Sequence, residues 1–210
     1  MSVCYVVGAG ECRSLPIKKY NGDLIIAADG GLKYLENAGL SADIAIGDFD
    51  SLGHTPCGEN VIRLKPEKDV TDMYAAVEEG MRRGYENFEI FGATGGRLDH
   101  TIANIQLAAF LAKKNLSHRI HGDGYSIVAV DNSSISFDSS FSGYISVFAH
   151  SDVCMGVTIE GLKYELNDGR LTNTFSLGVS NEFIGKESRI SVEKGVLIII
   201  YTNKTKENKR

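Results

Sequence analysis

The first 120 residues alternate between short apolar runs and longer segments with apolar residues at helical spacing. Five runs rich in Val, Ile, Ala and Phe are typical of buried strands. They occupy residues 3–9, 23–29, 43–48, 60–66 and 87–93. Apolar residues every three or four positions predict three helices, at residues 30–40, 71–85 and 99–115. Strands that alternate with helices predict a mostly parallel sheet covered on both faces.

After residue 120 the pattern changes to short runs in which apolar and polar residues alternate, and no segment has helical spacing. Such runs predict strands. They occupy residues 125–132, 133–138, 143–150, 157–161, 162–166, 188–193 and 195–201. Turn signals at Asn167-Asp168-Gly169 and Lys194-Gly195 separate some of them. The pattern predicts a sandwich or a small barrel.

The fold expected from both patterns is an α/β N-terminal domain with a mostly parallel sheet, followed by an all-β C-terminal sandwich domain. We place the first domain at residues 1–121 and the second at residues 122–203. Residues 204–210 are polar and basic, which is typical of a solvated, disordered tail.

Composition narrows the class of protein. The 210 residues are 43% hydrophobic and 23% charged, and the net charge is −5, which argues against a nucleic-acid binder with a broad basic surface. No apolar run approaches the ~20 residues of a membrane-spanning helix, and the N-terminus lacks the layout of a signal peptide. The four cysteines, Cys4, Cys12, Cys57 and Cys154, show no C-x-x-C spacing. We therefore expect a cytoplasmic protein with free thiols rather than disulfides or zinc.

Acidic residues directly follow three of the predicted strands. Asp29 follows the second strand, Asp48 and Asp50 follow the third in the stretch "IGDFDS", and Asp99 lies in "FGATGGRLDH" after the fifth. In open α/β sheets ligands bind beyond the carboxyl ends of the strands. If the chain stays extended at Phe49, the carboxylates on either side of it point the same way.

A fourth motif, "KPEKDVTD", stands between a predicted strand and a helix and contains Lys68, Asp69, Thr71 and Asp72. Carboxylates gathered at one end of a sheet repel each other unless a cation lies among them. Mg²⁺ binds carboxylates, waters and phosphate oxygens. The four motifs together therefore predict a site for a divalent metal and a polyphosphate.

Capping is the alternative role for several of these residues. Asp29 and Asp99 each stand just before a predicted helix, and residues 69–72 resemble a capping box. The Asp48–Asp50 stretch can also form a turn with side-chain hydrogen bonds. Caps do not have to converge on one point, whereas metal ligands do, so the geometry decides between the two readings.

Glycines and basic residues add a phosphate-binding pattern. Thr94, Gly95 and Gly96 lie between a strand and a helix, where backbone N–H groups can approach phosphate. Arg97 offers two parallel donors, and Lys68 a compact positive charge. A metal site with these groups is typical of phosphoryl transfer.

Two other glycine patterns do not amount to nucleotide fingerprints. "VVGAGE" places Gly8 and Gly10 as in G-x-G-x-x-G, but Arg13 stands at the third glycine position, so we interpret the stretch as a tight turn. No G-x-x-x-x-G-K-[ST] is present, which excludes a Walker-type P-loop enzyme.

The motifs "AADGG", "IGDFDS", "EKDVTD" and "GATGGRLDH" occur in the order found in thiamine pyrophosphokinases, and the second half contains the matching "GLKYEL" and "LGVSNEF". The resemblance covers nearly the whole chain. It implies an α/β domain that binds ATP and Mg²⁺ and a β-sandwich domain that helps to form a homodimer. It also implies that the thiamine hydroxyl attacks the β-phosphorus of ATP, so that thiamine diphosphate forms and AMP leaves.

The resemblance also implies roles for individual residues. Metal and polyphosphate binding fall to Asp48, Asp50 and Asp72, which with Arg97 form the expected catalytic set. The expected nucleotide-binding residues are Asp29, Lys68, Asp69, Thr71, Thr94, Gly95, Gly96 and Asp99. Thiamine is expected at Tyr164, Ser180 and Asn181. A turn is the alternative role for Ser180 and Asn181, and core packing that for Tyr164.

Two other functions stay open at this stage. Aspartate clusters at strand ends also serve metal-dependent phosphohydrolases, although this chain has few histidines to act as ligands. A non-catalytic nucleotide sensor, with the β half as a docking module, is the second alternative. A sensor needs less concentrated negative charge than these carboxylates supply.

Overall fold

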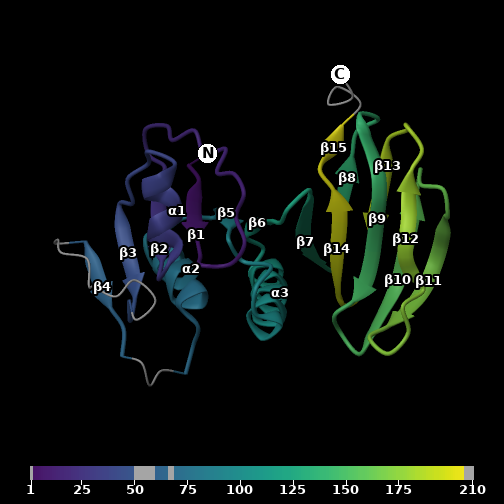
Figure 1. Ribbon diagram of the computed structural model, residues 1–210. Helices are drawn as coiled ribbons and strands as arrows, with labels where there is room; N and C mark the ends of the chain where they lie inside the picture. Colours follow the sequence, from purple (N-terminus) through teal and green to yellow (C-terminus); the bar gives the residue numbers. More distant parts are fainter. Residues whose placement is uncertain (1, 50–59, 66–68, 206–210) are drawn as a thin grey trace. The chain divides into compact units, whose positions relative to one another are not determined.

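The computed structural model describes residues 2–49, 60–65 and 69–205 (Figure 1). Contacts divide the chain into two compact units. The first comprises Met1–Leu107 and Leu116–Asp123, and the second comprises Ala108–Asn115 and Gly124–Arg210. The domain limits expected from the sequence, 1–121 and 122–203, stay a prediction.

The first unit contains a parallel sheet with the strand order β6-β5-β1-β2-β3-β4. Its strands are β1 (Cys4–Val7), β2 (Leu24–Ala28), β3 (Ile44–Gly47), β4 (Val61–Arg63), β5 (Asn87–Phe91) and β6 (Ser117–His121). The helices are α1 (Gly31–Asn37), α2 (Asp72–Arg82) and α3 (Leu98–Lys113), the last of which the division between the units cuts after Leu107. The parallel α/β arrangement expected from the sequence is confirmed.

Helices cover both faces of this sheet because its strands are apolar on both sides. All five residues of β2 are buried. Leu35 of α1 packs in a cluster with Val7 and Ile25. On the other face Gly80 of α2 lies so close to Cys4 that an added Cβ would be 2.8 Å from its Sγ. Burial raises the pKa of the Cys4 thiol to about 12, so this thiol stays neutral as a small apolar group.

The second unit is an antiparallel sandwich, as expected (Figure 1). One sheet has the order β12-β9-β14-β7 and the other β11-β10-β13-β8. The strands are β7 (Tyr125–Asp131), β8 (Ser134–Phe137), β9 (Phe141–Ala149), β10 (Val153–Glu160), β11 (Leu166–Thr172), β12 (Gly178–Phe183), β13 (Ser188–Ser191), β14 (Val196–Thr202) and β15 (Lys204–Thr205). Residues of both sheets share one core that includes Val147, Ile159, Ile190 and Leu197.

Two strands with few apolar residues, β6 and β12, were not predicted from the sequence. β6 was not expected, because Ile120 is the one apolar residue among its five. His118 of this strand is nevertheless buried. Burial lowers the pKa of His118, so the neutral ring fills a core position. β12 contains Ser180 and Asn181, for which a turn was the alternative. Ser180 has φ of +60° at a shift in the pairing with β9.

Three further stretches differ from expectation. Lys163–Glu165, expected in a strand, form a bend before β11. Asn167-Asp168-Gly169, expected as a turn, lie within β11 at an irregular pairing with β10, where Asp168 has φ of +48°. A turn signal inside a paired strand has become a bulge. Lys204 and Thr205, assigned to the tail, form β15 and pair with Ser142 and Phe141.

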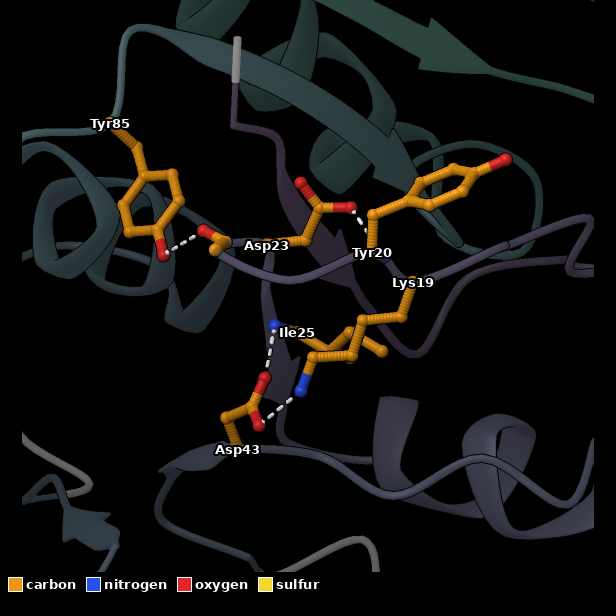
Figure 2. A network of polar contacts seen from close by, with 7 residues as sticks. Lys19, Tyr20, Asp23, Ile25, Asp43 and Tyr85 are labelled. Atoms are coloured by element: carbon orange, nitrogen blue, oxygen red, sulfur yellow. Dashed lines mark hydrogen bonds and ion pairs between the residues drawn. The ribbon is translucent and has the colours of Figure 1, made fainter.

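A polar network holds the chain that enters β2, at the end of the sheet away from the carboxyl ends of the strands (Figure 2). The Asp23 carboxylate accepts hydrogen bonds from the backbone N–H groups of Val3 at 2.8 Å and Tyr20 at 2.9 Å. The Asp43 carboxylate accepts one from Ile25 N–H at 2.7 Å and pairs with the Lys19 ammonium. These carboxylates satisfy N–H groups at the start of the central strands.

No helix in the described part of the chain is long and apolar enough to cross a membrane. Three cysteines of that part, Cys4, Cys12 and Cys154, are free thiols as expected, and Cys57 lies outside it.

We predict that Asp43→Ala lowers the free energy of unfolding by about 2 kcal/mol, because the buried N–H of Ile25 loses its acceptor. Asp123→Ala is the control. Asp123 pairs with Arg13 at 3.1 Å on the surface, with side chains 47% and 80% exposed, so its loss is expected to cost less than about 1 kcal/mol. Urea unfolding measures both changes. Equal small changes would contradict the role given to Asp43.

Candidate active site

A cavity of about 450 Å³ lies in the first unit, at the carboxyl ends of β1, β2 and β5 and at the first turns of α2 and α3. This is the position at which open parallel sheets bind ligands. Its walls come from the loops after the three strands and from Thr71–Met73, His100 and Asn104.

The loops after β1 and β5 form one side of the cavity and interlock. Gly8 N–H donates to Phe91 O, and Gly10 N–H donates to Gly92 O, both at 2.8 Å. Gly92 has φ of +59°, and an added Cβ there would be 2.3 Å from Gly8 O. Only glycine allows this approach. The "VVGAGE" stretch, which we interpreted as a tight turn, therefore forms part of the cavity wall.

The N-terminus of α2 points its first residues at the same space. Thr71 is the N-cap, and its Oγ1 accepts a hydrogen bond from Tyr74 N–H at 3.2 Å. Thr71 and Asp72 both line the cavity, whereas the exposed Asp69 does not. A helix N-terminus favours phosphate because its backbone N–H groups point outward and the positive end of the helix dipole lies there.

The capping alternative holds for Thr71, fails for Asp29 and holds in part for Asp99. The N-cap of α1 is Gly30, with no side-chain hydrogen bond, so Asp29 is not a cap. Asp99 lies inside the first turn of α3, where its Oδ1 accepts a hydrogen bond from His100 N–H at 3.0 Å. Asp29 lines the cavity with φ of +48°. Backbone strain of this kind is concentrated at functional sites.

The end of β3 lies directly beside Asp29. Asp29 N–H donates to Ile46 O at 2.8 Å, and an added Cβ at Gly47 would be 3.0 Å from Asp29 Cα. Asp48 follows and is half-buried. Phe49 is buried with φ of +62°, so the chain is not extended there, contrary to the condition on which the alignment of Asp48 and Asp50 was expected.

Arg97 and Asp99 form an exposed ion pair at the start of α3. The distances are 2.6 Å from Nη2 to Oδ2 and 3.2 Å from Nε to Oδ1. Hydrogen bonding from Arg97 lowers the pKa of the Asp99 carboxyl. Arg97 lines the cavity but stays 73% exposed. Its guanidinium is therefore held in place by Asp99 while it keeps a surface for an incoming anion.

Some predicted residues are not tested by this geometry. Asp50 and Lys68 lie outside the described residues. Within residues 2–49, 60–65 and 69–205 no three His, Cys, Asp or Glu side chains lie close enough to hold a metal. The predicted metal set includes Asp50, so it stays a prediction. Thr94 is buried, and its carbonyl accepts a hydrogen bond from Glu11 N–H at 2.8 Å, while Gly95 and Gly96 line the cavity.

The second unit has its own smaller cavity, of about 160 Å³, in which Tyr164 and Asn181 meet. The Asn181 amide forms two hydrogen bonds with the Tyr164 backbone. Oδ1 accepts from N–H at 3.0 Å, and Nδ2 donates to the carbonyl at 2.6 Å. Asn181 is 4% exposed, whereas the Tyr164 side chain is exposed. Ser180 is exposed and does not line this cavity, and its N–H donates to Ser146 Oγ at 3.1 Å.

Both units of the chain match known protein families. Residues 18–120 match the family described as thiamin pyrophosphokinase, catalytic domain, and residues 132–197 match thiamin pyrophosphokinase, vitamin B1 binding domain. The chain belongs to the thiamine pyrophosphokinase family. Enzymes of this family form thiamine diphosphate from thiamine and ATP, and this is the activity that the matches assign to the chain.

Proteins similar to this chain match it over almost its full length. The thiamine pyrophosphokinase of Bacillus subtilis is 32% identical over 95% of this chain and 98% of its own. The crystal structure of the Bacillus subtilis thiamine pyrophosphokinase superposes with a TM-score of 0.81 at 28% identity, over 96% of this chain and 99% of that one. A thiamin pyrophosphokinase family protein of Enterococcus faecalis gives a TM-score of 0.81 at 27% identity, over 97% and 99% of the two chains.

We predict that Gly92→Ala in this thiamine pyrophosphokinase family member costs more than about 2 kcal/mol of stability, because the new Cβ adds a collision with Gly8 O to the strain of positive φ. Gly39→Ala is the matched control. Gly39 has φ of +68° with nothing within 4 Å of an added Cβ, so only the strain of about 1 kcal/mol applies. Chemical unfolding measures the difference. Equal losses would show that the loops do not interlock as described.

Proposed function

We propose that the cavity of the first unit holds the triphosphate of ATP and is the place where pyrophosphate passes to thiamine. The observation that carries this proposal is the convergence of three phosphate-binding features on one space. These are the N-terminus of α2, the glycine loop at residues 95–96 and the Arg97 guanidinium. The space lies at the carboxyl ends of three neighbouring strands.

In the proposed reaction the thiamine hydroxyl oxygen bonds to the β-phosphorus of ATP. The bond from that phosphorus to the oxygen bridging the α-phosphate breaks, AMP leaves with that oxygen, and a carboxylate takes the hydroxyl proton. Asp72 is our candidate for this acceptor, since it lines the cavity at the helix N-terminus. Catalysis of this kind depends mainly on positioning and on charge neutralisation.

Mg²⁺ is the metal we propose, with Asp48, Asp50 and Asp72 as its ligands and Asp29 and Asp69 nearby. Family members typically use a divalent metal. The described part of the site fits this choice, because Asp29 and Asp72 line the cavity and Asp48 follows the strand beside Asp29, giving oxygen donors only. The ion would supply positive charge to the phosphate oxygens.

The remaining nucleotide contacts come from the chain itself. Arg97 and Lys68 are proposed to bind phosphate oxygens, with Asp99 keeping the Arg97 guanidinium in position. Thr71 fixes the first turn of α2. Thr94 anchors the loop, so that Gly95 and Gly96 present backbone at the cavity.

For thiamine we propose the cavity of the second unit, which lies within the matched vitamin B1 binding domain. Thiamine is flat and cationic, so it suits an aromatic side chain next to a carboxylate. Tyr164 and Glu165 provide these groups. The chain has no Trp, so the aromatic contact falls to Tyr or Phe. Asn181 contributes by holding the Tyr164 backbone, and Ser180 by shaping the bulge beside it.

A homodimer and a cytoplasmic location belong to the same proposal. β12 is an edge strand of its sheet, and large apolar side chains lie exposed on it and beside it. These are Tyr144, Phe175, Leu177, Val179 and Ile184. Leu162 and Lys163 pair with Phe183 and Glu182 at one end of this edge, and exposed apolar residues beside the rest of it favour burial against a second copy. The free thiols of Cys4, Cys12 and Cys154 suit a reducing compartment.

We predict that the purified protein, given ATP, Mg²⁺ and thiamine, produces AMP and thiamine diphosphate in equal amounts. Asp72→Asn should lower kcat roughly a hundredfold or more, because a charged group at the reacting phosphates is lost. Asp123→Asn, an exposed acid that follows β6 and does not line the cavity, is the control. Chromatography of nucleotides and thiamine species measures the products.

Other products would reject specific parts of the proposal. ADP with thiamine monophosphate would mean attack at the γ-phosphate. AMP released without thiamine would indicate a hydrolase. Full activity of Asp72→Asn would remove Asp72 from the site.

We predict a dimer in sedimentation velocity that Phe175→Asp weakens about tenfold or more, because a charge replaces a contact of the second unit that is 69% exposed in the single chain. Tyr20→Asp, 61% exposed in the first unit, is the matched control and should leave association unchanged. A monomer at all concentrations, or equal weakening by both variants, would contradict the interface.

A further inference from the structure

Asn104 lies on α3 one turn after His100, and both side chains line the cavity of the first unit. Only 5% of Asn104 is exposed. Sequence patterns do not single out Asn104, because it stands in an apolar stretch and belongs to none of the acidic or glycine motifs. A buried amide on the wall of a cavity needs partners for both of its ends.

One end of the Asn104 amide has a partner within the protein. The amide nitrogen donates to Ala93 O at 2.7 Å. A backbone carbonyl can only accept, so the atom that faces it has to be Nδ2, and this decides the orientation of the amide. Oδ1 therefore points away from the loop after β5.

The other end of the amide is available to a ligand. No donor among the described residues forms a hydrogen bond with Oδ1. Oδ1 is also not among the side-chain oxygens sealed from all accessible space. The space that Asn104 borders is the cavity. A buried carbonyl oxygen without a donor is costly, so an occupant that supplies a donor gains from this position.

We propose that Asn104 is a substrate-binding residue whose Oδ1 accepts a hydrogen bond from a neutral N–H or O–H group of a bound substrate. The proposal rests on the proposed function, since it takes the cavity to be the substrate site. Phosphate oxygens only accept, so the donor comes from elsewhere on the substrates. ATP has a 6-amino group and two ribose hydroxyls, and thiamine has a pyrimidine amino group.

A purely structural role is the competing explanation, because the Nδ2 bond to Ala93 O ties α3 to the loop after β5. Loss of that bond lowers stability and can lower activity toward every substrate equally. Loss of an acceptor at Oδ1 instead removes discrimination against one substrate analogue. The experiment therefore compares ratios of kcat/KM between a substrate and its analogue, in which a general loss cancels.

The analogues each lack one donor. They are purine riboside triphosphate, 2′-deoxy-ATP, 3′-deoxy-ATP and thiamine with hydrogen in place of the pyrimidine amino group. We expect wild type to use one of them roughly five- to tenfold less well than its parent. Asn104→Leu removes the acceptor and should abolish that ratio. Asn104→Asp keeps an acceptor and should retain it. Gln106→Leu, an exposed amide on the same helix, is the matched control and should also retain it.

The outcomes distinguish failure of the role proposed for Asn104 from failure of the proposed function. The proposal is overturned if wild type discriminates against none of the analogues, or if Asn104→Leu discriminates as wild type does while only its melting temperature falls. Should Asn104→Leu not fold, Asn104→Ala supplies the same comparison without a branched side chain. Absence of thiamine diphosphate from unmodified ATP and thiamine would instead reject the proposed function.

Discussion

The close contact between the loops after β1 and β5 is the constraint on which the first unit depends. Gly92 takes a left-handed backbone conformation against Gly8 O, and Gly10 N–H bonds to Gly92 O. An added Cβ at Gly8 would also meet Met73 of α2 at 2.3 Å. The first turn of α2 and the loop after β5 are therefore both seated on the same glycines. The cavity is what remains when backbone, rather than side chains, brings these elements together.

The second unit depends on side-chain packing instead. A sandwich core of aliphatic residues and a cluster of Phe137, Phe141 and Tyr201 stabilises its two sheets. The segment between β10 and β11 pairs with β12 at Leu162 and Lys163, and residues 164–165 belong to no strand. Asn181 supplies the missing backbone partners at Tyr164, which places an exposed aromatic ring at the edge of a cavity.

Apolar periodicity was enough to predict the parallel sheet, its helices and most strands of the sandwich, because burial of one or both faces leaves a clear pattern. It failed where polar residues occupy strands. β6 buries a neutral histidine, and β12 contains Ser180 and Asn181. The Asn-Asp-Gly signal at 167–169 was overridden because pairing with β10 continues through it. Tertiary pairing decided these cases, and local sequence does not report it.

The residues of the site also divide into those that local sequence indicates and those that depend on tertiary contacts. Asp29 follows a strand end, and Asp72 and Arg97 stand at helix starts, so these residues could be selected because such boundaries are visible in the sequence. Gly8, Gly10 and Asn104 could not, since their roles arise from contacts with Gly92 and Ala93. Gly92 is about 80 residues away from the two glycines in the sequence, and Ala93 lies 11 residues before Asn104 in the loop after β5. The positive φ of Phe49 also has no local signal, since a bulky residue rarely adopts this conformation.

The account rests on the claim that the cavity of the first unit binds the triphosphate of ATP. A crystal structure with Mg²⁺ and the α,β-methylene analogue of ATP, which cannot be cleaved at the bond broken in the proposed reaction, tests it most directly. The account predicts density for the three phosphates between the first turn of α2, Gly95–Gly96 and Arg97. Phosphate density elsewhere in the chain, with this cavity empty, would contradict it.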